Sequence, residues 1–302
     1  MTIAITGATG FVGQALLDVA AASGLDVRAL ARGAQADRLG TTWISGDLAN
    51  HTALGTLVAG AEAVIHVAGV VNTPEPAMFE SGNVAGTANV LTAMQAAGVR
   101  RLVHVSSLSA REPQLSLYGA SKARAEALVR ESGLDWTIVR PPAIYGPRDR
   151  DMFELFRSAK WGVVPVPANG RASLIHVDDL ARLLLALALG GDLVSRQCFD
   201  PDDGKPGGWS HQELAQAIGA AMDRRVWAPG LPPYLLTWAA RGDKLLRGAK
   251  ARLTFDRVGY LTHPDWAVSE DARVPAELWS PQVPTPDGLR ATADWYRSNG
   301  WL

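Results

Sequence analysis

The first residues of the chain constrain its fold more than any other segment. Residues 2–5 form a short apolar, β-branched run typical of a strand, and residues 14–22 have the alanine- and leucine-rich composition of a helix. Between the two lies the sequence Thr6-Gly7-Ala8-Thr9-Gly10-Phe11-Val12-Gly13. The three glycines therefore occupy a strand-to-helix turn, as at the start of a βα unit.

Glycines at such a turn have distinct roles in binding a dinucleotide. The lack of a Cβ allows a tight turn at Gly7, lets the backbone approach a pyrophosphate at Gly10, and lets the helix pack on the strand at Gly13. The free amides of the helix N-terminus would then bind the phosphates. A glycine-rich turn without a ligand is the alternative, but the place of this triplet in the first strand-turn-helix favours the dinucleotide site.

Strands and helices alternate along the first half of the chain. Residues 63–67, 101–106 and 136–139 have the composition of strands, and residues 78–97 and 118–131 have that of helices. This alternation predicts an α/β fold: a doubly wound parallel sheet of the Rossmann type with a smaller C-terminal substrate-binding lobe.

The alternation ends after residue 141, and the domain boundaries follow from where it resumes. The strand-like residues 173–177 are expected to return to the sheet. The sequence therefore predicts a dinucleotide-binding Rossmann domain over residues 1–165, to which residues 172–200 return, and a substrate-binding lobe over residues 201–302.

His176, Asp178 and Asp179 stand together at the end of that returning strand. Asp178 is a natural N-cap for the apolar helix that follows. We interpret the three residues as a structural junction and predict no metal site, because no third ligand has suitable spacing.

The end of the second strand distinguishes the two nicotinamide cofactors. Residues 25–31 form that strand, and an NAD site would carry an Asp or Glu at its end to bind the ribose hydroxyls. Here the strand ends in Arg32, whose guanidinium suits a 2′-phosphate, while Asp26 lies at the wrong end. The sequence predicts a preference for NADP(H) over NAD(H), with an ordinary solvated arginine as the alternative.

A tyrosine and a lysine four residues apart point to acid catalysis. In Tyr118-Gly-Ala-Ser-Lys122 the two side chains lie one helical turn apart on one face. The ammonium stabilises the phenolate form, so the phenol becomes a usable acid at neutral pH. Ser106 and Ser107 stand upstream, at the end of an apolar run. Chance produces such pairs in some chains, but the glycine loop makes coincidence a poor explanation.

These motifs, in this order, resemble the short-chain dehydrogenase/reductase superfamily, in the extended branch that also contains sugar-nucleotide epimerases and dehydratases. The spacing Gly7-x-x-Gly10-x-x-Gly13 matches that branch, and the resemblance covers most of the chain. It implies catalytic roles for Ser107, Tyr118 and Lys122, and a catalytic or structural role for Asn83.

The resemblance also implies a cofactor site. Residues 46–48 and 67–69 match the family's cofactor-contacting segments, and residues 140–147 resemble the loop that holds the nicotinamide. The implied cofactor-binding residues are Gly7, Thr9, Gly10, Phe11, Val12, Gly13, Arg32, Asp47, Leu48, Val67, Ala68, Gly69, Lys122, Pro141 and Ile144.

Two departures from the family pattern bear on the site. Ser107 and Tyr118 are closer in sequence than is usual in the extended branch, which leaves Ser109 as a second candidate hydroxyl. The chain is also short for a sugar-nucleotide epimerase. The sequence of residues 140–147 is more similar to the matching segment of hydroxysteroid dehydrogenases and dihydroflavonol reductases. The resemblance therefore favours an apolar ketone over a nucleotide sugar as the substrate.

Composition argues against several other classes. A formal net charge of −1 offers no basic field for nucleic acid, so no such partner is expected. The single Cys198 gives neither an internal disulfide nor a metal-ligand pattern. Residues 180–189 are too short to span a bilayer, and we expect no signal peptide before the first strand. We expect a cytoplasmic protein, with peripheral contact at the inner face of a membrane left open and the oligomeric state not predicted.

The C-terminal part is rich in tryptophan and basic residues. Most of its rings are expected to form the core of the lobe: Trp209, Trp227, Trp238, Trp266, Trp279, Trp295 and Trp301. Residues 231–258 form a basic amphipathic segment, with an apolar stripe at Leu235, Ala239, Gly242, Leu246, Ala249 and Leu253 and with cations at Arg241, Lys244, Arg247, Lys250, Arg252 and Arg257. We favour a segment that lies over the core with its charges in water; contact with an anionic membrane beside a lipid substrate is the alternative.

The predicted function is an NADPH-dependent reductase of a bulky apolar ketone, such as a keto-lipid of the 3-oxo-sphingoid or ceramide type or a steroid-like ketone. Tyr118 would be the general acid, Ser107 would bind the developing oxyanion, Lys122 would tune Tyr118 and bind the nicotinamide ribose, and Asn83 would hold a relay water. Two alternatives stay open, because fold does not determine function. They are a sugar-nucleotide epimerase or dehydratase that retains its cofactor, and a redox-silent NADP-binding structural or assembly protein.

Overall fold

The computed structural model describes residues 1–248 and 253–302 of the chain. Its contacts divide the chain into two compact units, Met1–Arg140 with Leu180–Phe199, and Pro141–Asp179 with Asp200–Leu302. The first boundary thus falls at residue 140, whereas the sequence placed it at residue 165. The physical reason is that the strand following residue 140 pairs outside the large sheet.

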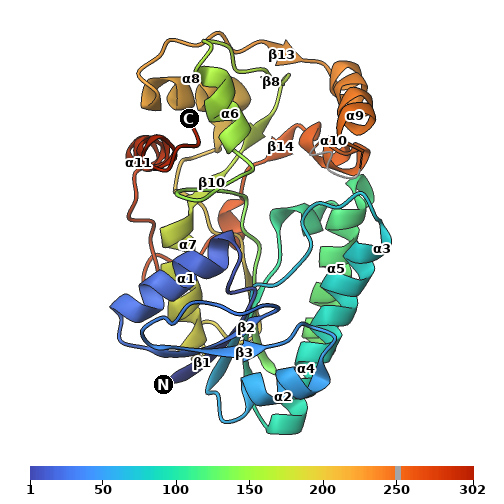
Figure 1. The fold of residues 1–302 in the computed structure, drawn as a ribbon, viewed down its shortest axis with the longest axis vertical. Helices are drawn as coiled ribbons and strands as arrows, with labels where there is room; N and C mark the ends of the chain where they lie inside the picture. Colours follow the sequence, from blue (N-terminus) through green and yellow to red (C-terminus); the bar gives the residue numbers. More distant parts are fainter. Residues whose placement is uncertain (249–252) are drawn as a thin grey trace. The chain divides into compact units, whose positions relative to one another are not determined.

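A seven-stranded sheet forms the centre of the first unit (Figure 1). Its spatial order is β11-β6-β5-β4-β1-β2-β3, and every neighbouring pair is parallel. The strands are β1 (Thr2–Thr6), β2 (Asp26–Ala31), β3 (Thr41–Ser45), β4 (Ala63–His66), β5 (Arg101–Val105), β6 (Asp135–Val139) and β11 (Gln197–Phe199). The doubly wound Rossmann arrangement predicted from the alternation is confirmed.

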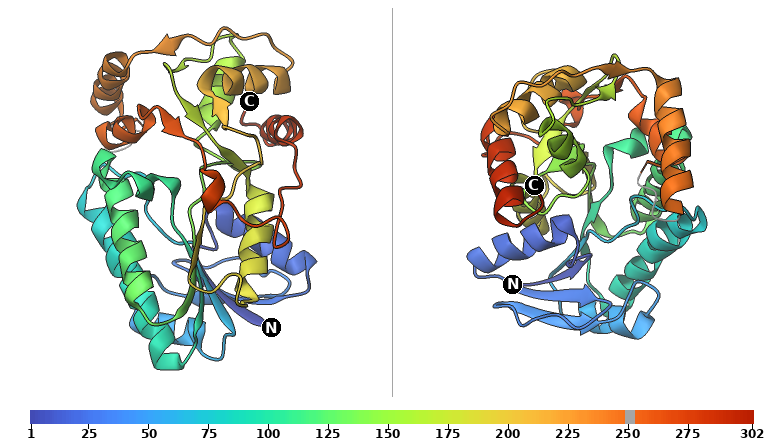
Figure 2. Two further views of the ribbon diagram at one scale, coloured as in Figure 1. Left: turned by 180° about the vertical axis from the view of Figure 1, so that it is seen from behind. Right: turned by 45° about the horizontal axis from the view of Figure 1, so that its top comes forward.

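Helices cover both faces of this sheet. On one face lie α2 (His51–Val58), α4 (Gly86–Ala97) and α5 (Leu117–Glu131), and on the other lie α1 (Phe11–Ala22) and the part of α7 (Val177–Ala188) that belongs to this unit, as Figures 1 and 2 show. The short helix α3 (Ala77–Phe79) and the π-helical stretch η1 (Glu80–Ala85) lead directly into α4. Central strands such as β4 and β5 are buried throughout, which explains their continuous apolar composition.

The strand predicted at residues 173–177 does not join the large sheet. β10 (Leu174–His176) pairs with β7 (Ala143–Tyr145) in a separate two-stranded sheet. The place beside β6 is taken by β11, so no edge remains there for β10. Asp178 lies inside the first turn of α7 rather than before it, and Asp179 accepts the backbone amides of residues 282 and 283.

The second unit is built from short strands and helices. Its paired strands are β7 with β10, β8 (Val166–Pro167) with β13 (Gly230–Leu231), and β9 (Arg171–Ala172) between β12 (Trp209–Ser210) and β14 (Asp265–Trp266). Its helices are α6 (Phe153–Ala159), α8 (His211–Ala221), α9 (Pro233–Arg247), α10 (Phe255–Leu261) and α11 (Thr285–Ser298). Large buried side chains such as Tyr145, Phe156, Ile218, Leu289 and Tyr296 form its core.

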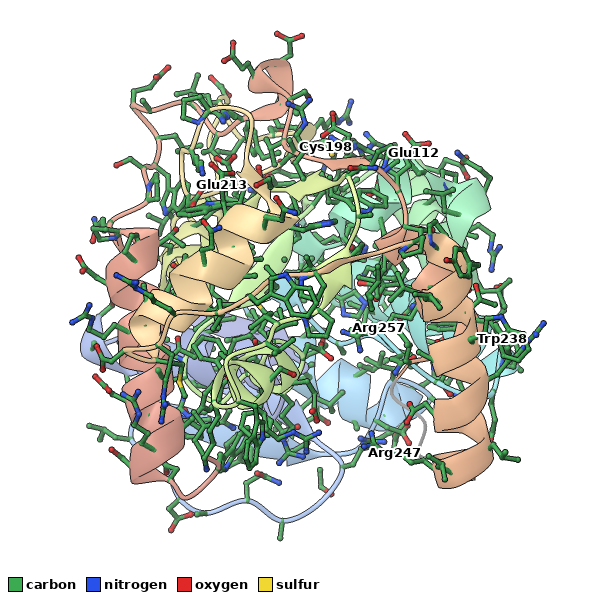
Figure 3. The ribbon with its side chains drawn as sticks, turned by 90° about the horizontal axis from the view of Figure 1, so that it is seen from above. Glu112, Cys198, Glu213, Trp238, Arg247 and Arg257 are labelled. Carbon is green, nitrogen blue, oxygen red and sulfur yellow. The ribbon has the colours of Figure 1, made fainter. Side chains whose placement is uncertain are left out.

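The tryptophans of this unit differ in their exposure. Trp295 and Trp301 pack against each other and against the core, as predicted. Trp227 and Trp238 are 70% and 64% exposed, so these two rings are not among those that form the core. Figure 3 shows Trp238 projecting outward from α9.

The apolar stripe of α9 faces away from the core. Ala240 is buried, whereas Leu235, Trp238, Leu245 and Leu246 are exposed. At 100° per residue the exposed side chains lie on the side of the helix opposite to Ala240. The favoured interpretation of a stripe resting on the core is therefore wrong for this helix. Of the predicted segment, Ala249, Lys250 and Arg252 lie outside the described residues.

Two helical glycines of the first unit give a matched test of packing. A Cβ on Gly13 in α1 would lie 2.1 Å from the Gly7 oxygen, whereas a Cβ on Gly55 in α2 would meet nothing within 4 Å. We expect Gly13→Ala to lower the free energy of unfolding by about 1–3 kcal/mol through overpacking. Gly55→Ala should raise it by about 0.5–1 kcal/mol, because it only removes backbone freedom. Urea unfolding measures both, and equal effects would contradict the tight turn.

Candidate active site

The turn after β1 brings three backbone segments into contact. Gly7 has a φ of +73°, and a Cβ there would lie 2.5 Å from the backbone nitrogen of Ala68, after β4. Gly13 packs α1 onto the same turn. Gly10 is exposed, and the nearest atom to a Cβ there would be 3.3 Å away. The turn thus combines a tight bend, close helix packing and one open face.

The N-terminus of α1 offers backbone donors. Gly10 is its N-cap, and no side chain caps this end. The amides of Phe11 and Val12 have no hydrogen-bond acceptor in the described part of the chain, and Thr9 beside them is exposed. A dinucleotide pyrophosphate fits this end, because free amides and the helix dipole both favour an anion.

Other predicted cofactor segments follow the neighbouring strands. Arg32 comes directly after β2, is exposed, and has no ion-pair partner among residues 1–248 and 253–302. Leu48 packs against Gly86 of α4, and Asp47 accepts the Ala49 amide at 2.9 Å. Val67, Ala68 and Gly69 follow β4. The carboxyl ends of these parallel strands form the edge at which ligands bind in this fold. Pro141 and Ile144 belong to the second unit.

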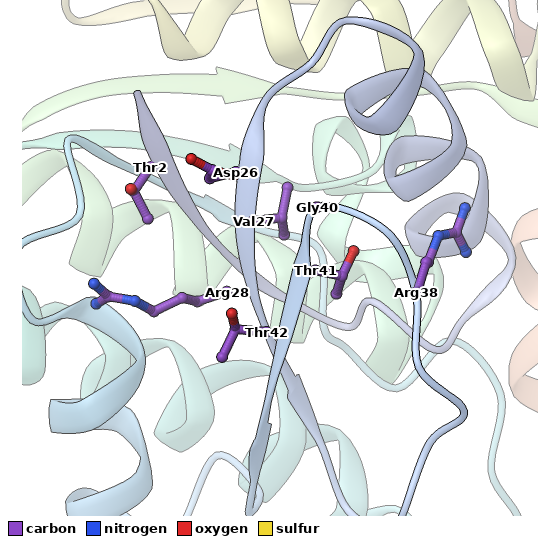
Figure 4. Close-up of a pocket in the computed structure, with 8 residues that line it drawn as sticks. All are labelled: Thr2, Asp26, Val27, Arg28, Arg38, Gly40, Thr41 and Thr42. Atoms are coloured by element: carbon purple, nitrogen blue, oxygen red, sulfur yellow. The ribbon is translucent and has the colours of Figure 1, made fainter.

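A second arginine near α1 was not predicted. Arg38 donates to Gln14 Oε1 at 3.0 Å and forms an ion pair with Asp18, so its guanidinium is already engaged within the protein. Arg38 also lines a polar hollow with Asp26 and Arg28 at the amino ends of β1, β2 and β3 (Figure 4). That hollow is at the end of the strands opposite to the glycine turn, so it is separate from the candidate site.

Ser107 and Ser109 differ in exposure and in hydrogen bonding. Ser107 Oγ accepts from the Ser109 amide at 3.2 Å and from Ser109 Oγ at 2.9 Å. Ser109 is buried, whereas Ser107 is half-buried. With both Ser109 donors directed at its oxygen, Ser107 keeps its own hydrogen for a ligand. The neighbouring Ser106 donates instead to Glu126 Oε1 at 2.6 Å.

α5 carries Tyr118 and Lys122 on its buried face. Ser116 caps the helix by accepting the Gly119 amide at 2.9 Å. A Cβ on Gly119 would lie 2.7 Å from the Ser109 oxygen, so the first turn of α5 packs directly on the turn that holds Ser107. Lys122 Nζ donates to the backbone oxygen of residue 105 at 2.7 Å, at the end of β5. The fold therefore brings the predicted serine, tyrosine and lysine to one place.

The carboxylate of Glu126, which was not predicted from the sequence, stabilises the positive charge of Lys122. Burial lowers the pKa of Lys122 to about 8, and Glu126, one turn further along α5, acts in the opposite direction. Burial alone would raise the pKa of Glu126, but hydrogen bonds and charge from Arg140, with Ser106 and Arg130, bring it below its usual value. The i,i+4 spacing from Lys122 to Glu126 was the available signal.

Asn83 lies in η1 and joins two parts of the site. Its amide nitrogen donates to the Val70 oxygen at 2.9 Å and to Ser121 Oγ at 2.8 Å, and its Oδ1 accepts the Val70 amide at 2.7 Å. Because Ser121 lies between Tyr118 and Lys122, Asn83 links the loop after β4 to α5. The relay water suggested for Asn83 stays a prediction.

Known proteins resemble both the sequence and the fold. A family model described as NAD(P)H-binding matches residues 7–188. A protein of Caulobacter vibrioides named ceramide reductase is 36% identical over 312 aligned positions, which cover 99% of this chain and 96% of that one. A putative dihydroflavonol 4-reductase of Synechocystis is 28% identical and covers 99% and 95%. The structure of MoeE5 in complex with UDP-glucuronic acid and NAD has a TM-score of 0.75, 23% identity and 99% coverage of both chains.

The family match covers more than half of the chain, and the Caulobacter relative aligns along nearly all of it. The MoeE5 structure shares the doubly wound sheet that carries the glycine turn and α5. The chain therefore belongs to the NAD(P)-binding extended short-chain dehydrogenase/reductase family and is an enzyme of the oxidoreductase type.

Proposed function

We propose that this enzyme is an NADPH-dependent reductase of a bulky apolar ketone. The observation that carries the proposal is the Ser107 hydroxyl, which accepts both donors of Ser109 and keeps its own hydrogen for a carbonyl oxygen. Tyr118 and Lys122 lie on the helix packed against the same turn. A hydrogen-bond donor, an acid and a cation at one place suit the reduction of a carbonyl.

Each of these residues has a defined task in the reaction. Bound NADPH supplies the hydride that adds to the carbonyl carbon. Ser107 donates a hydrogen bond to the carbonyl oxygen and stabilises the negative charge that develops there. Tyr118 donates the proton that converts this oxygen to a hydroxyl. Lys122 is mostly an ammonium at neutral pH, since its pKa is about 8, and it stabilises the phenolate left on Tyr118.

The substrate class is supported by similarity. The relative that aligns with nearly the whole chain is named a ceramide reductase, and the Synechocystis relative carries the name of a dihydroflavonol reductase. Residues 140–147 resemble the same side of the family. We therefore favour a keto-lipid, such as a 3-oxo-ceramide or a 3-oxo-sphingoid base, with a steroid-like ketone as the next choice.

Two other functions have distinct experimental signatures. A sugar-nucleotide epimerase or dehydratase, the alternative that the family resemblance left open, would hold NAD(H) tightly and turn over a nucleotide sugar without net cofactor consumption. A redox-silent NADP-binding assembly protein would oxidise no NADPH. Stoichiometric NADPH oxidation with 3-oxo-ceramide distinguishes a reductase from both.

The role of Tyr118 can be tested by removing one oxygen atom. We expect Tyr118→Phe to lower kcat at least about 100-fold, because a general acid contributes that much or more. NADPH binding, followed by fluorescence, should stay nearly unchanged. Tyr296→Phe is the control, since Tyr296 donates a buried hydrogen bond to the Asp149 oxygen in the second unit. A wild-type kcat in Tyr118→Phe would exclude the mechanism.

The proposed preference for NADPH over NADH rests on Arg32, which follows β2. No acid stands at that end of the strand, because Asp26 is its first residue. We expect Arg32→Ala to weaken NADPH binding by about 1.5–3 kcal/mol, the range for hydrogen bonds to a charged group, and to leave NADH binding nearly unchanged. Arg28→Ala, near the opposite end of the same strand, should affect neither cofactor. Equal binding of NADPH and NADH by the wild-type protein would refute the preference.

The exposed face of α9 supports peripheral contact with a membrane. Tyr234, Trp238, Arg241 and Leu245 recur at four- and three-residue steps and so form one stripe. The Arg241 guanidinium lies 5.1 Å from the centre of the Trp238 ring. Exposed rings and leucines beside cations suit an anionic lipid surface, from which a keto-lipid could enter the enzyme. In the described part of the chain, no helix is long and apolar enough to cross a bilayer.

Two equally exposed leucines provide a controlled test of this contact. Leu245 in α9 and Leu39 in the first unit are both 87% exposed. We expect Leu245→Ser to weaken partitioning onto phosphatidylglycerol vesicles by about 1–2 kcal/mol, because the leucine would leave an apolar environment. Leu39→Ser should have no effect in the same sedimentation assay. Equal losses in the two variants, or no binding by the wild-type protein, would contradict the contact.

A further inference from the structure

Three buried polar side chains form a row across the sheet of the first unit. The strand register pairs Thr6 of β1 with His66 of β4, and His66 with His104 of β5. Each is at most 1% exposed. The row faces the helices α4 and α5, since His66 contacts Thr87 of α4 and the charge of Lys122 on α5 acts on both histidine rings. The reaction described above uses none of these side chains.

The hydrogen bonds of His66 have a fixed direction. The Asn83 carbonyl can only accept, so the Thr87 hydroxyl donates to it at 2.6 Å. Thr87 Oγ1 therefore accepts from His66 Nε2 at 3.1 Å, and His66 Nδ1 accepts from Thr6 Oγ1 at 2.6 Å. At the other end the Ala68 amide donates to Thr6 Oγ1 at 3.3 Å, which agrees with this direction. One neutral tautomer, protonated at Nε2, satisfies all four bonds.

The surroundings keep the His66 ring neutral. Burial lowers the pKa of His66 to about 3, and the positive charge of Lys122 acts in the same direction. The His104 ring, whose centre is 5.3 Å away, has its pKa lowered by burial, by Lys122 and by His66. The nearby carboxylate Glu126 is bound by Arg140 and Ser106. A neutral imidazole keeps the one donor and one acceptor that the hydrogen bonds require.

The two partners of His66 belong to different parts of the site. Thr6 directly precedes Gly7 and so begins the cofactor turn. The other partner, Thr87, donates to the Asn83 carbonyl. The Asn83 amide in turn donates to Ser121, on the helix that carries Tyr118 and Lys122. Asn83 lies in a π-helical stretch, a feature that recurs at functional sites.

We propose that His66 is a positioning residue whose Nδ1 holds the start of the cofactor turn and whose Nε2 holds the Asn83 segment against the catalytic helix. One ring then fixes the position of the cofactor turn relative to the catalytic helix. The catalytic half of this inference rests on the proposed reductase function, and the cofactor half rests on family membership alone.

Two substitutions separate the two halves. His66→Gln keeps a donor near the place of Nε2 but loses the acceptor for Thr6, so we expect NADPH binding to weaken about tenfold with kcat nearly unchanged. His66→Asn keeps an acceptor near the place of Nδ1 but loses the donor to Thr87, so we expect kcat to fall about tenfold with NADPH binding unchanged. NADPH fluorescence titration and NADPH oxidation with 3-oxo-ceramide in mixed micelles measure the two effects.

Isosteric partners and a neighbouring histidine provide the controls. Thr6→Val should reproduce the binding loss and Thr87→Val the loss of kcat, with His66 itself intact. His104→Phe should change neither, because both ring nitrogens of the equally buried His104 have no hydrogen-bond partner in the described part of the chain. A purely structural role would lower binding and kcat together in His66→Gln, His66→Asn and His104→Phe, in step with their melting temperatures, and that result would overturn the inference.

The inference and the proposed function fail in different ways. If the wild-type protein reduces no ketone, the reductase proposal fails and the NADPH titrations alone decide the role of His66. Weaker binding confined to His66→Gln and Thr6→Val would then support it. Equal affinities across all five variants would overturn it.

Discussion

The close approach of backbones at Gly7 is the contact on which the site of the first unit depends. A side chain on Gly7 would clash with Ala68, which follows β4, and a side chain on Gly13 of α1 would clash with the Gly7 oxygen. As a result the free amides of α1 lie at the sheet edge where the loops after β2, β3 and β4 begin. A larger residue at Gly7 would separate the helix from the strands and move the free amides of α1 away from this edge.

Buried charge is the second organising feature of this unit. Lys122, Glu126 and Arg140 form a compact arrangement in which each desolvated charge has a partner of opposite sign or a backbone oxygen. Such an arrangement is costly to disturb, because removing one member leaves a buried charge without compensation. Lys122, the lysine of the proposed mechanism, is therefore held by these contacts as well as by its place on α5.

The second unit meets a different requirement. Its core is closed by aromatic packing among Phe153, Phe156, Tyr296 and Trp301, so the apolar side chains of α9 are not needed to fill it. They remain on the surface, where an apolar face with rings and cations suits a lipid interface better than water. A reductase of membrane lipids would gain access to its substrate through such a helix.

The sequence by itself determined the features that depend on short spacings. The glycine turn, the placement of Tyr118 and Lys122 on one helical face, and the alternation that builds the sheet are all local patterns set by backbone geometry. Only the tertiary structure decided that β11 fills the edge beside β6, so that residues 174–176 pair elsewhere. The tertiary structure also decided which side of α9 faces water, because the periodicity of the sequence shows an apolar stripe but not what packs against that stripe. The partners of His66 lie 60 and 21 residues away in the chain, and a contact at that separation leaves no local pattern in the sequence.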